Sequence, residues 1–309
     1  MFNLNAVSPV ASIFILLLVG YASRKLRILS VKDTGIIDSI VINLALPAFI
    51  FTSIHGKPLY IDMLKAPVIS IAAQIIVLGA AYLIGRLLRL NRPTIGALMI
   101  ASAFGNTGYL GLPFVTAVFD GNKAAIQSAV MIDSIGMRPL LCTVGVSVAT
   151  CFAGQKFDWR NMLEFIKTPL LPALLIGLAL RSVYIPDPIM KAVTFMGAAT
   201  VPLSMLSVGL NLSTGSAKKW PIAISTAVVL KLAALPAIIY FGLPLFGIEH
   251  TVAKTAVLEM AMPSAIFGGV IAGRYGANKE FVAGAIFVST LLSVVAIPTV
   301  LAILASSFA

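Results

Sequence analysis

Charged residues are scarce in this chain of 309 residues. Asp, Glu, Lys and Arg together make up 11% of it. A water-soluble domain has about 25% charged and about 45–50% apolar residues, whereas 59% of this chain is hydrophobic and its mean hydropathy is +1.02. The composition excludes a soluble globule and predicts an all-α integral membrane protein.

Cysteine and histidine are also rare, with two residues of each. Cys142 and Cys151 fall in one apolar stretch without zinc-ligand spacing, so they predict neither a disulfide framework nor a metal site. No nucleophile-and-base set is present, and "GNTGYLG" lacks the Lys-Ser/Thr that completes a phosphate-binding loop. These absences argue against an enzyme and against a bound organic cofactor.

Long apolar runs are abundant. Runs of roughly 17–25 residues can cross a bilayer core as helices, and the sequence predicts ten such spans. They cover residues 7–23, 36–54, 66–88, 94–119, 124–152, 168–184, 189–212, 221–241, 251–272 and 281–306. The basic residues follow the first run rather than precede it, unlike those of a cleavable signal, so we expect that run to be retained.

Basic residues are distributed unevenly between the two sides of the predicted membrane. Fourteen follow the odd-numbered spans: Arg24, Lys25, Arg27, Lys32, Arg86, Arg89, Arg92, Lys156, Arg160, Lys167, Lys218, Lys219, Arg274 and Lys279. Six lie on the opposite side: Lys57, Lys65, Lys123, Arg181, Lys191 and Lys254. Because cytoplasmic loops carry the excess, we expect a multi-pass inner-membrane protein with both termini outside. The net charge of +11 then reflects contact with anionic lipid and requires no nucleic acid.

The ten spans match one another as five and five. "INLALPAFIFTSI" pairs with "GAATVPLSMLSVG", aligning Pro47 with Pro202, and "GNTGYLGLPFVTAVF" pairs with "LEMAMPSAIFGGVIAGRYG", aligning Pro113 with Pro263. Each half has an odd number of spans, so the second enters the membrane from the opposite side, which is an inverted repeat. The predicted parts are a first repeat at 1–153, a cytoplasmic connection at 154–167 and a second repeat at 168–309.

Glycine and proline interrupt the fourth and ninth spans. Pro113 and Pro263, with the glycines around them, predict two broken helices that cross near the midplane. Unpaired backbone at that depth requires protein or a polar cavity, and half-helix N-termini attract anions. Ordinary proline kinks are the alternative. The candidate substrate-binding residues are Asn43, Asn106, Thr107, Tyr109, Pro113, Pro263 and Ser264.

Four ionisable residues stand out inside the predicted spans: Asp133, Arg138, Lys231 and Glu259. Such residues are costly in a membrane and face a partner or a cavity. Asp133 and Arg138 are five residues apart, so on one helix they need not pair, and we interpret Arg138 as part of a structural salt bridge. Lys231 and Glu259 predict a neighbouring pair that is either a static lock or a switch linked to a proton or another ion.

Several of these segments resemble the auxin efflux carrier family in its short prokaryotic form. They are "NLALPAFIF", "GNTGYLGLPF", "LKLAALP" and "MPSAIFGGVIAGRYG", and the resemblance covers essentially the whole chain. It implies a ten-helix crossed-helix fold with a transport part and a scaffold part, shared with bile-acid and sodium/proton transporters. It also implies transport of small organic anions, with bacterial members assigned to malonate and other carboxylates, and a substrate site at Asn106 and Pro113.

The chain lacks the long loop that plant members carry after the fifth span, so auxin itself is not implied. We therefore predict a secondary carrier of small organic carboxylates that works by alternating access, as a uniporter or coupled to a proton or sodium ion. The alternative is a membrane receptor or sensor for such anions that uses the same fold without net transport. The expected partners are the anion and the lipid bilayer, and a homodimer is compatible with the sequence.

Overall fold

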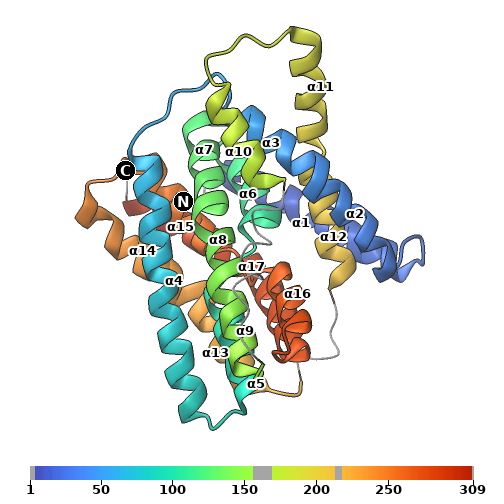
Figure 1. The fold of residues 1–309 in the computed structure, drawn as a ribbon, viewed down its shortest axis with the longest axis vertical. Helices are drawn as coiled ribbons and strands as arrows, with labels where there is room; N and C mark the ends of the chain where they lie inside the picture. The colour runs from blue at the N-terminus through green and yellow to red at the C-terminus, as the bar shows by residue number, and fades with distance from the viewer. Residues whose placement is uncertain (1–3, 156–168, 213–217, 308–309) are drawn as a thin grey trace.

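The structure is a computed structural model that describes residues 4–155, 169–212 and 218–307. These residues form helices and no β-strand, which confirms the all-α expectation for this part of the chain (Figure 1). The cytoplasmic connection predicted at 154–167 falls almost entirely on residues 156–168, outside the described residues.

The helices follow one another with short connections. The first half contains α1 (Leu4–Lys25), α2 (Thr34–Ile40), α3 (Leu46–Ile54), α4 (Asp62–Leu87), α5 (Arg92–Ala103), α6 (Leu112–Val118), α7 (Lys123–Met131), α8 (Arg138–Leu140) and α9 (Val146–Phe152). The second half contains α10 (Leu170–Ala179), α11 (Asp187–Ala198), α12 (Thr200–Asn211), α13 (Pro221–Val229), α14 (Leu235–Gly242), α15 (His250–Met260), α16 (Ile266–Arg274) and α17 (Lys279–Ser307). Short 3₁₀ turns are η1 (Val31–Asp33) and η8 (Leu243–Phe246).

Six continuous helical runs in the described residues are long and apolar enough to cross a membrane. They are Val31–Ile54, Asp62–Leu87, Lys123–Phe152, Asp187–Asn211, Pro221–Gly242 and Lys279–Ser306. The spans predicted at 94–119 and 251–272 are each divided into two helices, as their glycines and prolines indicated. The span predicted at 168–184 contains a shorter apolar helix, α10.

Wide π-helical turns interrupt several of the long runs. They are η2 (Val41–Ala45), η3 (Thr107–Gly111), η4 (Ile132–Met137), η5 (Leu141–Gly145) and η7 (Leu230–Ala234). In the described residues, all of these except η5 end two residues before a proline, namely Pro47, Pro113, Pro139 and Pro236. A proline ring clashes with the carbonyl four residues earlier, and a wider i→i+5 turn relieves that clash without ending the helix.

The helices pack as two groups, each drawn from both halves of the chain. We call α1–α3 and α10–α12 the panel helices, because α1 packs along α12 and α3 packs against α10 and α11. We call α4–α9 and α13–α17 the core bundle, in which α4 packs on α5 and α7 on α15. In Figure 1, α2, α11 and α12 lie on the right and α4, α14 and α15 on the left. The groups meet where α12 contacts η3 and α1 contacts α6.

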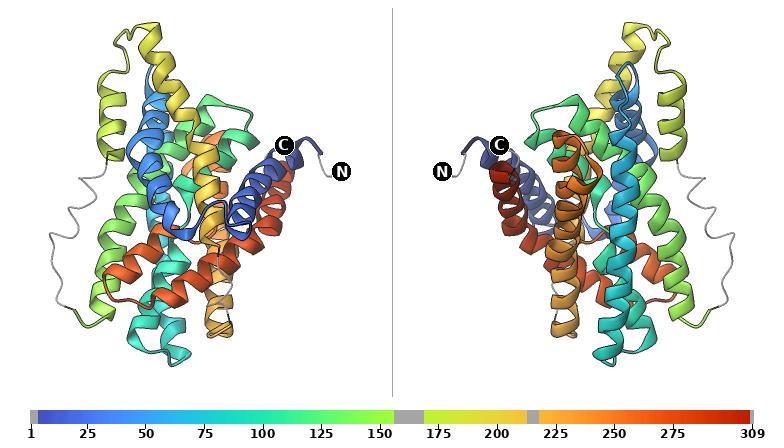
Figure 2. Two further views of the ribbon diagram at one scale, coloured as in Figure 1. Left: turned by 90° about the vertical axis from the view of Figure 1, so that its right-hand side faces the viewer. Right: turned by 90° about the vertical axis from the view of Figure 1, so that its left-hand side faces the viewer.

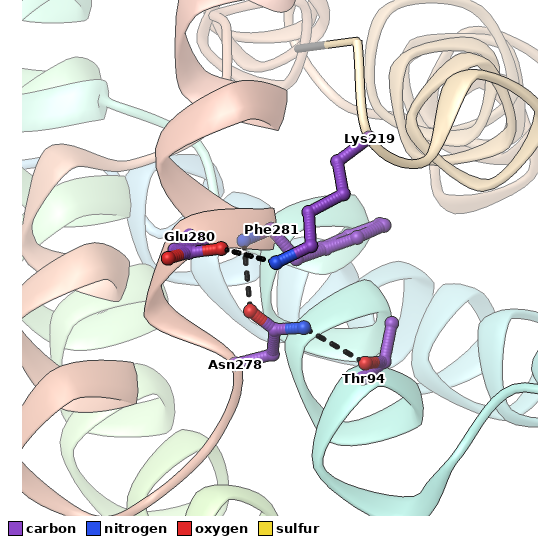
Figure 3. A network of polar contacts seen from close by, with 5 residues as sticks. All are labelled: Thr94, Lys219, Asn278, Glu280 and Phe281. Atoms are coloured by element: carbon purple, nitrogen blue, oxygen red, sulfur yellow. Dashed lines mark hydrogen bonds and ion pairs between the residues drawn. The ribbon is translucent and has the colours of Figure 1, made fainter. Parts of the chain in front are cut away.

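Polar contacts fix the ends of several core-bundle helices. Asn278, just before α17, donates to the Thr94 hydroxyl of α5 (2.9 Å) and accepts from the Phe281 N–H (3.1 Å) (Figure 3). The Glu249 carboxylate caps α15 by accepting the backbone N–H groups of residues 251 and 252. Burial raises the pKa of Glu249, but these hydrogen bonds outweigh it and hold the pKa below its usual range.

The helices α1 and α12 approach each other closely at Gly20 and Gly209, where glycine faces glycine. A Cβ at Gly209 would lie 2.8 Å from the Tyr21 nitrogen and 2.9 Å from the Gly20 Cα. Small residues let helix backbones approach closely in membranes. In Figure 2, the start of α1 and the end of α17 lie on the same side of the molecule, where these two helices also touch.

We predict that Gly209→Ala destabilises the protein by about 1–3 kcal/mol, because the added methyl group meets backbone that cannot move alone. Gly79→Ala on α4 is the matched control: no atom lies within 4 Å of its Cβ position, and alanine favours a helix over glycine by about 1 kcal/mol. Thermal unfolding in one detergent compares the two variants. Equal melting temperatures would show that α1 and α12 do not depend on this contact.

Candidate functional site

The two divided helices meet at their breaks. Residues 104–106 separate α5 from η3, and residues 261–265 separate α15 from α16. Gly105 and Ser264 form an isolated antiparallel bridge. The Asn106 N–H donates to the Pro263 carbonyl (2.7 Å), and the Ala265 N–H donates to the Phe104 carbonyl (2.9 Å). Each break therefore satisfies backbone groups of the other, as buried backbone in a membrane requires.

Small and hydroxylated residues make this meeting of backbones feasible. A Cβ at Gly105 would lie 2.9 Å from Cε of Lys231, so a side chain there would displace the lysine. The Ser264 hydroxyl donates to the Ala101 carbonyl of α5 (2.7 Å). Its backbone N–H donates to the Ser289 hydroxyl of α17 (3.1 Å). Ser264 thus ties the second break to the helices on either side of it.

The two prolines have different positions relative to the breaks. Pro263 lies within the second break, as predicted. Pro113 does not lie within the first break: the non-helical residues are 104–106, and Pro113 follows η3 in the first turn of α6. Because η3 and α6 form one helical run, Thr107–Val118, Pro113 lies inside that run, where a proline removes one backbone hydrogen bond and clashes with the preceding turn. Pro113 therefore widens the turn before it, whereas Gly105 and Asn106 interrupt the helix.

Asp133 and Arg138 form a buried ion pair, in agreement with the interpretation of Arg138 as part of a structural salt bridge. The expectation from sequence was only that two residues five apart on one helix need not pair with each other. Nη2 of Arg138 lies 2.7 Å from Oδ2 of Asp133. The expectation assumed α-helical spacing, but η4 spans this segment, and an i→i+5 turn brings residues five apart onto one face. The Thr107 hydroxyl donates to Oδ1 of Asp133 (2.6 Å), so the pair also holds the first residue of η3.

Asn106 brings an unpartnered donor to the meeting point. Its side chain is 5% exposed, and Nδ2 has no hydrogen-bond partner. Its backbone carbonyl accepts from the N–H groups of residues 110 and 111, which starts η3. Nε of Arg138 is likewise buried without a partner. A buried donor without an acceptor is costly, so these two atoms mark places where an anion would be stabilised.

Lys231 and Glu259 are both fully buried, but they do not form an ion pair in the described structure. Nζ of Lys231 donates to the carbonyl of Met260, the residue after Glu259 (2.6 Å). Both carboxylate oxygens of Glu259 lack a hydrogen-bond partner. A Cβ at Gly111 would collide with this carboxylate, so Glu259 packs directly on η3.

Asn43 and Tyr109 lie in different surroundings. The exposed Asn43 side chain donates to the Ser39 carbonyl within its own helix (2.9 Å). The Tyr109 hydroxyl donates to Oδ1 of Asp38 (3.2 Å). Asp38 was not predicted as a site residue, although it lies inside the span predicted at 36–54. Its position two residues into that span was the available signal.

The residues at the breaks are buried. Asn106, Thr107 and Ser264 are nearly inaccessible, with 5%, 0% and 1% exposure. The described residues contain no group of three His, Cys, Asp or Glu that could hold a metal ion. Two buried donors near the breaks have no hydrogen-bond partner, Nδ2 of Asn106 and Nε of Arg138. Thr107–Val118 and α16 also begin at the breaks, and the dipoles of helix starts favour negative charge.

We predict that Arg138→Gln destabilises the protein by about 3–5 kcal/mol, because it leaves the Asp133 carboxylate buried and unpaired. Lys219→Gln is the control: it breaks an ion pair with Glu280 whose side chains are 63% and 64% exposed (Figure 3), and such pairs contribute about 0–1 kcal/mol. Melting temperatures in one detergent compare the variants. Similar losses in both would mean that the buried pair has no special structural role.

The chain matches the membrane transport protein family over residues 5–150 and 157–301. It is 30% identical to an uncharacterized transporter of Methanocaldococcus jannaschii, covering 92% of this chain and 94% of that protein. It is 30% identical to an uncharacterized transporter of Methanothermobacter thermautotrophicus (96% and 98%) and 26% identical to a putative malonate transporter of Rhizobium meliloti (95% and 94%). The chain therefore belongs to the auxin efflux carrier-like membrane transport protein family, and it is a transporter, not an enzyme.

Proposed function

We propose that the protein is a secondary carrier of small organic anions, and of carboxylates in particular. The observation that carries this proposal is the meeting of two broken helices beside the unpartnered amide of Asn106. Both Thr107–Val118 and α16 begin there, and helix starts favour negative charge. An amide can donate two hydrogen bonds to a carboxylate, and Ser264 lies directly opposite Gly105.

The substrate class draws on both chemistry and comparison. A buried carboxylate needs several donors. The unpartnered amide of Asn106 is one, and the Arg138 guanidinium lies close by, since a Cβ at Gly108 would collide with it. One relative carries the name putative malonate transporter. Malonate is therefore the first anion to test. Glu259, buried without a partner, is the carboxyl group best placed to take a coupling proton or sodium ion.

The proposed architecture is ten spans arranged as two inverted repeats, residues 1–153 and 168–309. The family match is interrupted at residues 151–156, close to the proposed boundary between the halves. The packing also supports it, because panel helices and core bundle each combine corresponding helices of both halves. The residues at the breaks are almost inaccessible. Alternating access would therefore require the core bundle to move against the panel helices to expose the site on each side in turn.

We predict that Asn106→Ala weakens malonate binding by about one to two decades, because losing a donor to a buried carboxylate costs about 1–3 kcal/mol. Asn211→Ala is the control, since that amide donates to the Ser207 carbonyl within α12 (3.1 Å). Calorimetry on purified protein measures both variants. If Asn106→Ala binds malonate as the wild type does, the substrate site lies elsewhere and the crossing is only a hinge.

The proposed location is the inner membrane with both termini outside, as the excess of basic residues after the odd-numbered spans favours. We predict that a cysteine at Tyr60, in a variant lacking Cys142 and Cys151, reacts with a membrane-impermeant thiol reagent in intact cells. A cysteine at Arg89, at the other end of α4, should react only after lysis. The reverse pattern would invert the topology.

A further inference from the structure

Asp38 is a charged residue of the panel helices and is not one of the residues proposed to bind the anion. It lies on α2 and is partly buried. Its Oδ1 atom accepts two hydrogen bonds, from the Ser207 hydroxyl of α12 (2.5 Å) and from the Tyr109 hydroxyl of η3 (3.2 Å). No Lys or Arg forms an ion pair with Asp38 in the described part of the chain.

The two hydrogen bonds of Asp38 differ in what they join. Ser207 and Asp38 both belong to panel helices, so their bond stays within one group. Tyr109 belongs to the core bundle and lies three residues after Asn106, in the half-helix that starts at the break. The Tyr109–Asp38 bond therefore crosses the boundary between the groups, where α12 packs on η3.

Asp38 and a carboxylate substrate offer Tyr109 the same kind of acceptor. A phenol hydroxyl has a single proton to donate, so a strong bond to one carboxylate excludes an equal bond to another. The Asp38 charge also opposes a second negative charge nearby. The competition requires that an anion bound beside Asn106 reach the hydroxyl of Tyr109, which lies three residues further along the chain.

We propose that Asp38 is a positioning residue that links anion binding to movement of the core bundle. In the empty carrier, Asp38 holds Tyr109 and fastens η3 to the panel helices. A bound carboxylate takes the Tyr109 hydroxyl, and the Asp38–Tyr109 link opens. This inference rests on the proposed function, because the substrate is taken to be an anion bound at the breaks.

Calorimetry with malonate tests the competition. Asp38→Ala should tighten binding about 3- to 10-fold, because Tyr109 no longer has to leave another acceptor, whereas Tyr109→Phe should weaken it about 10-fold. In the Tyr109→Phe background, Asp38→Ala should increase the affinity for malonate clearly less than it does in the wild type. Thr52→Ala is the control, since its hydroxyl bonds to carbonyls of its own panel helix. An unchanged or weakened affinity in Asp38→Ala would overturn the competition.

Hydrogen exchange of the ligand-free protein tests the link without any substrate. Asp38→Ala and Tyr109→Phe should both speed exchange in Thr107–Gly111 about 10-fold relative to wild type and Thr52→Ala. Asp38→Asn, which keeps an acceptor oxygen, should exchange nearly as the wild type does. No acceleration in either of the first two variants would overturn the link. If the wild type binds neither malonate nor acetate, the proposed anion site fails, and exchange still decides whether Asp38 fastens the two groups.

Discussion

Backbone pairing between two interrupted helices is the interaction on which the rest of this structure depends. Breaking a helix inside a membrane frees N–H and C=O groups that lipid cannot satisfy. Here the breaks at residues 104–106 and 261–265 satisfy one another. Each break alone would leave backbone groups unpaired in the membrane. The broken helices of the two halves therefore have to stay together at this point. The surrounding features follow from it: glycine at position 105, Ser264 anchored on both sides, and buried charges around η3.

Much of this arrangement could be predicted from the sequence, and the failures have physical causes. Composition was enough for an all-α membrane protein, and glycine with proline indicated which two spans are interrupted. The first break was expected in the stretch of Pro113 and its neighbouring glycines; it lies at the start of that stretch, at residues 104–106, and Pro113 itself only follows the widened turn η3. A salt bridge of Arg138 was expected, but its partner Asp133 was not identified, because α-helical spacing was assumed where the helix is π. Lys231 is buried beside Glu259, as expected, but it donates to the carbonyl of the next residue, Met260, and forms no ion pair with the carboxylate.

At the candidate site, the sequence indicates the residue types but not which residues they contact. Residue types at the breaks could be read from the sequence, and Asn106, Thr107 and Ser264 do come together there. The hydrogen-bond partners of these residues could not be predicted from the sequence, because the partner lies 26 residues away for Thr107 and 163 residues away for Ser264. Asp38 shows a further limit. A charge near the start of a span can be assigned to the membrane surface, and only the approach of η3 and α12 gives it partners.

The π turns that precede prolines change which residues of a span lie on the same face of the helix. A π turn contains one residue more than an α turn, and one residue corresponds to about 100° around an α-helix. A wheel drawn straight through Ile132–Met137 therefore assigns every later residue of that span to the wrong face, and the same holds after Val41–Ala45 and Leu230–Ala234. In these spans the set of residues that face the lipid shifts by one position at the π turn before the proline. The segments before and after that turn therefore need separate helical wheels.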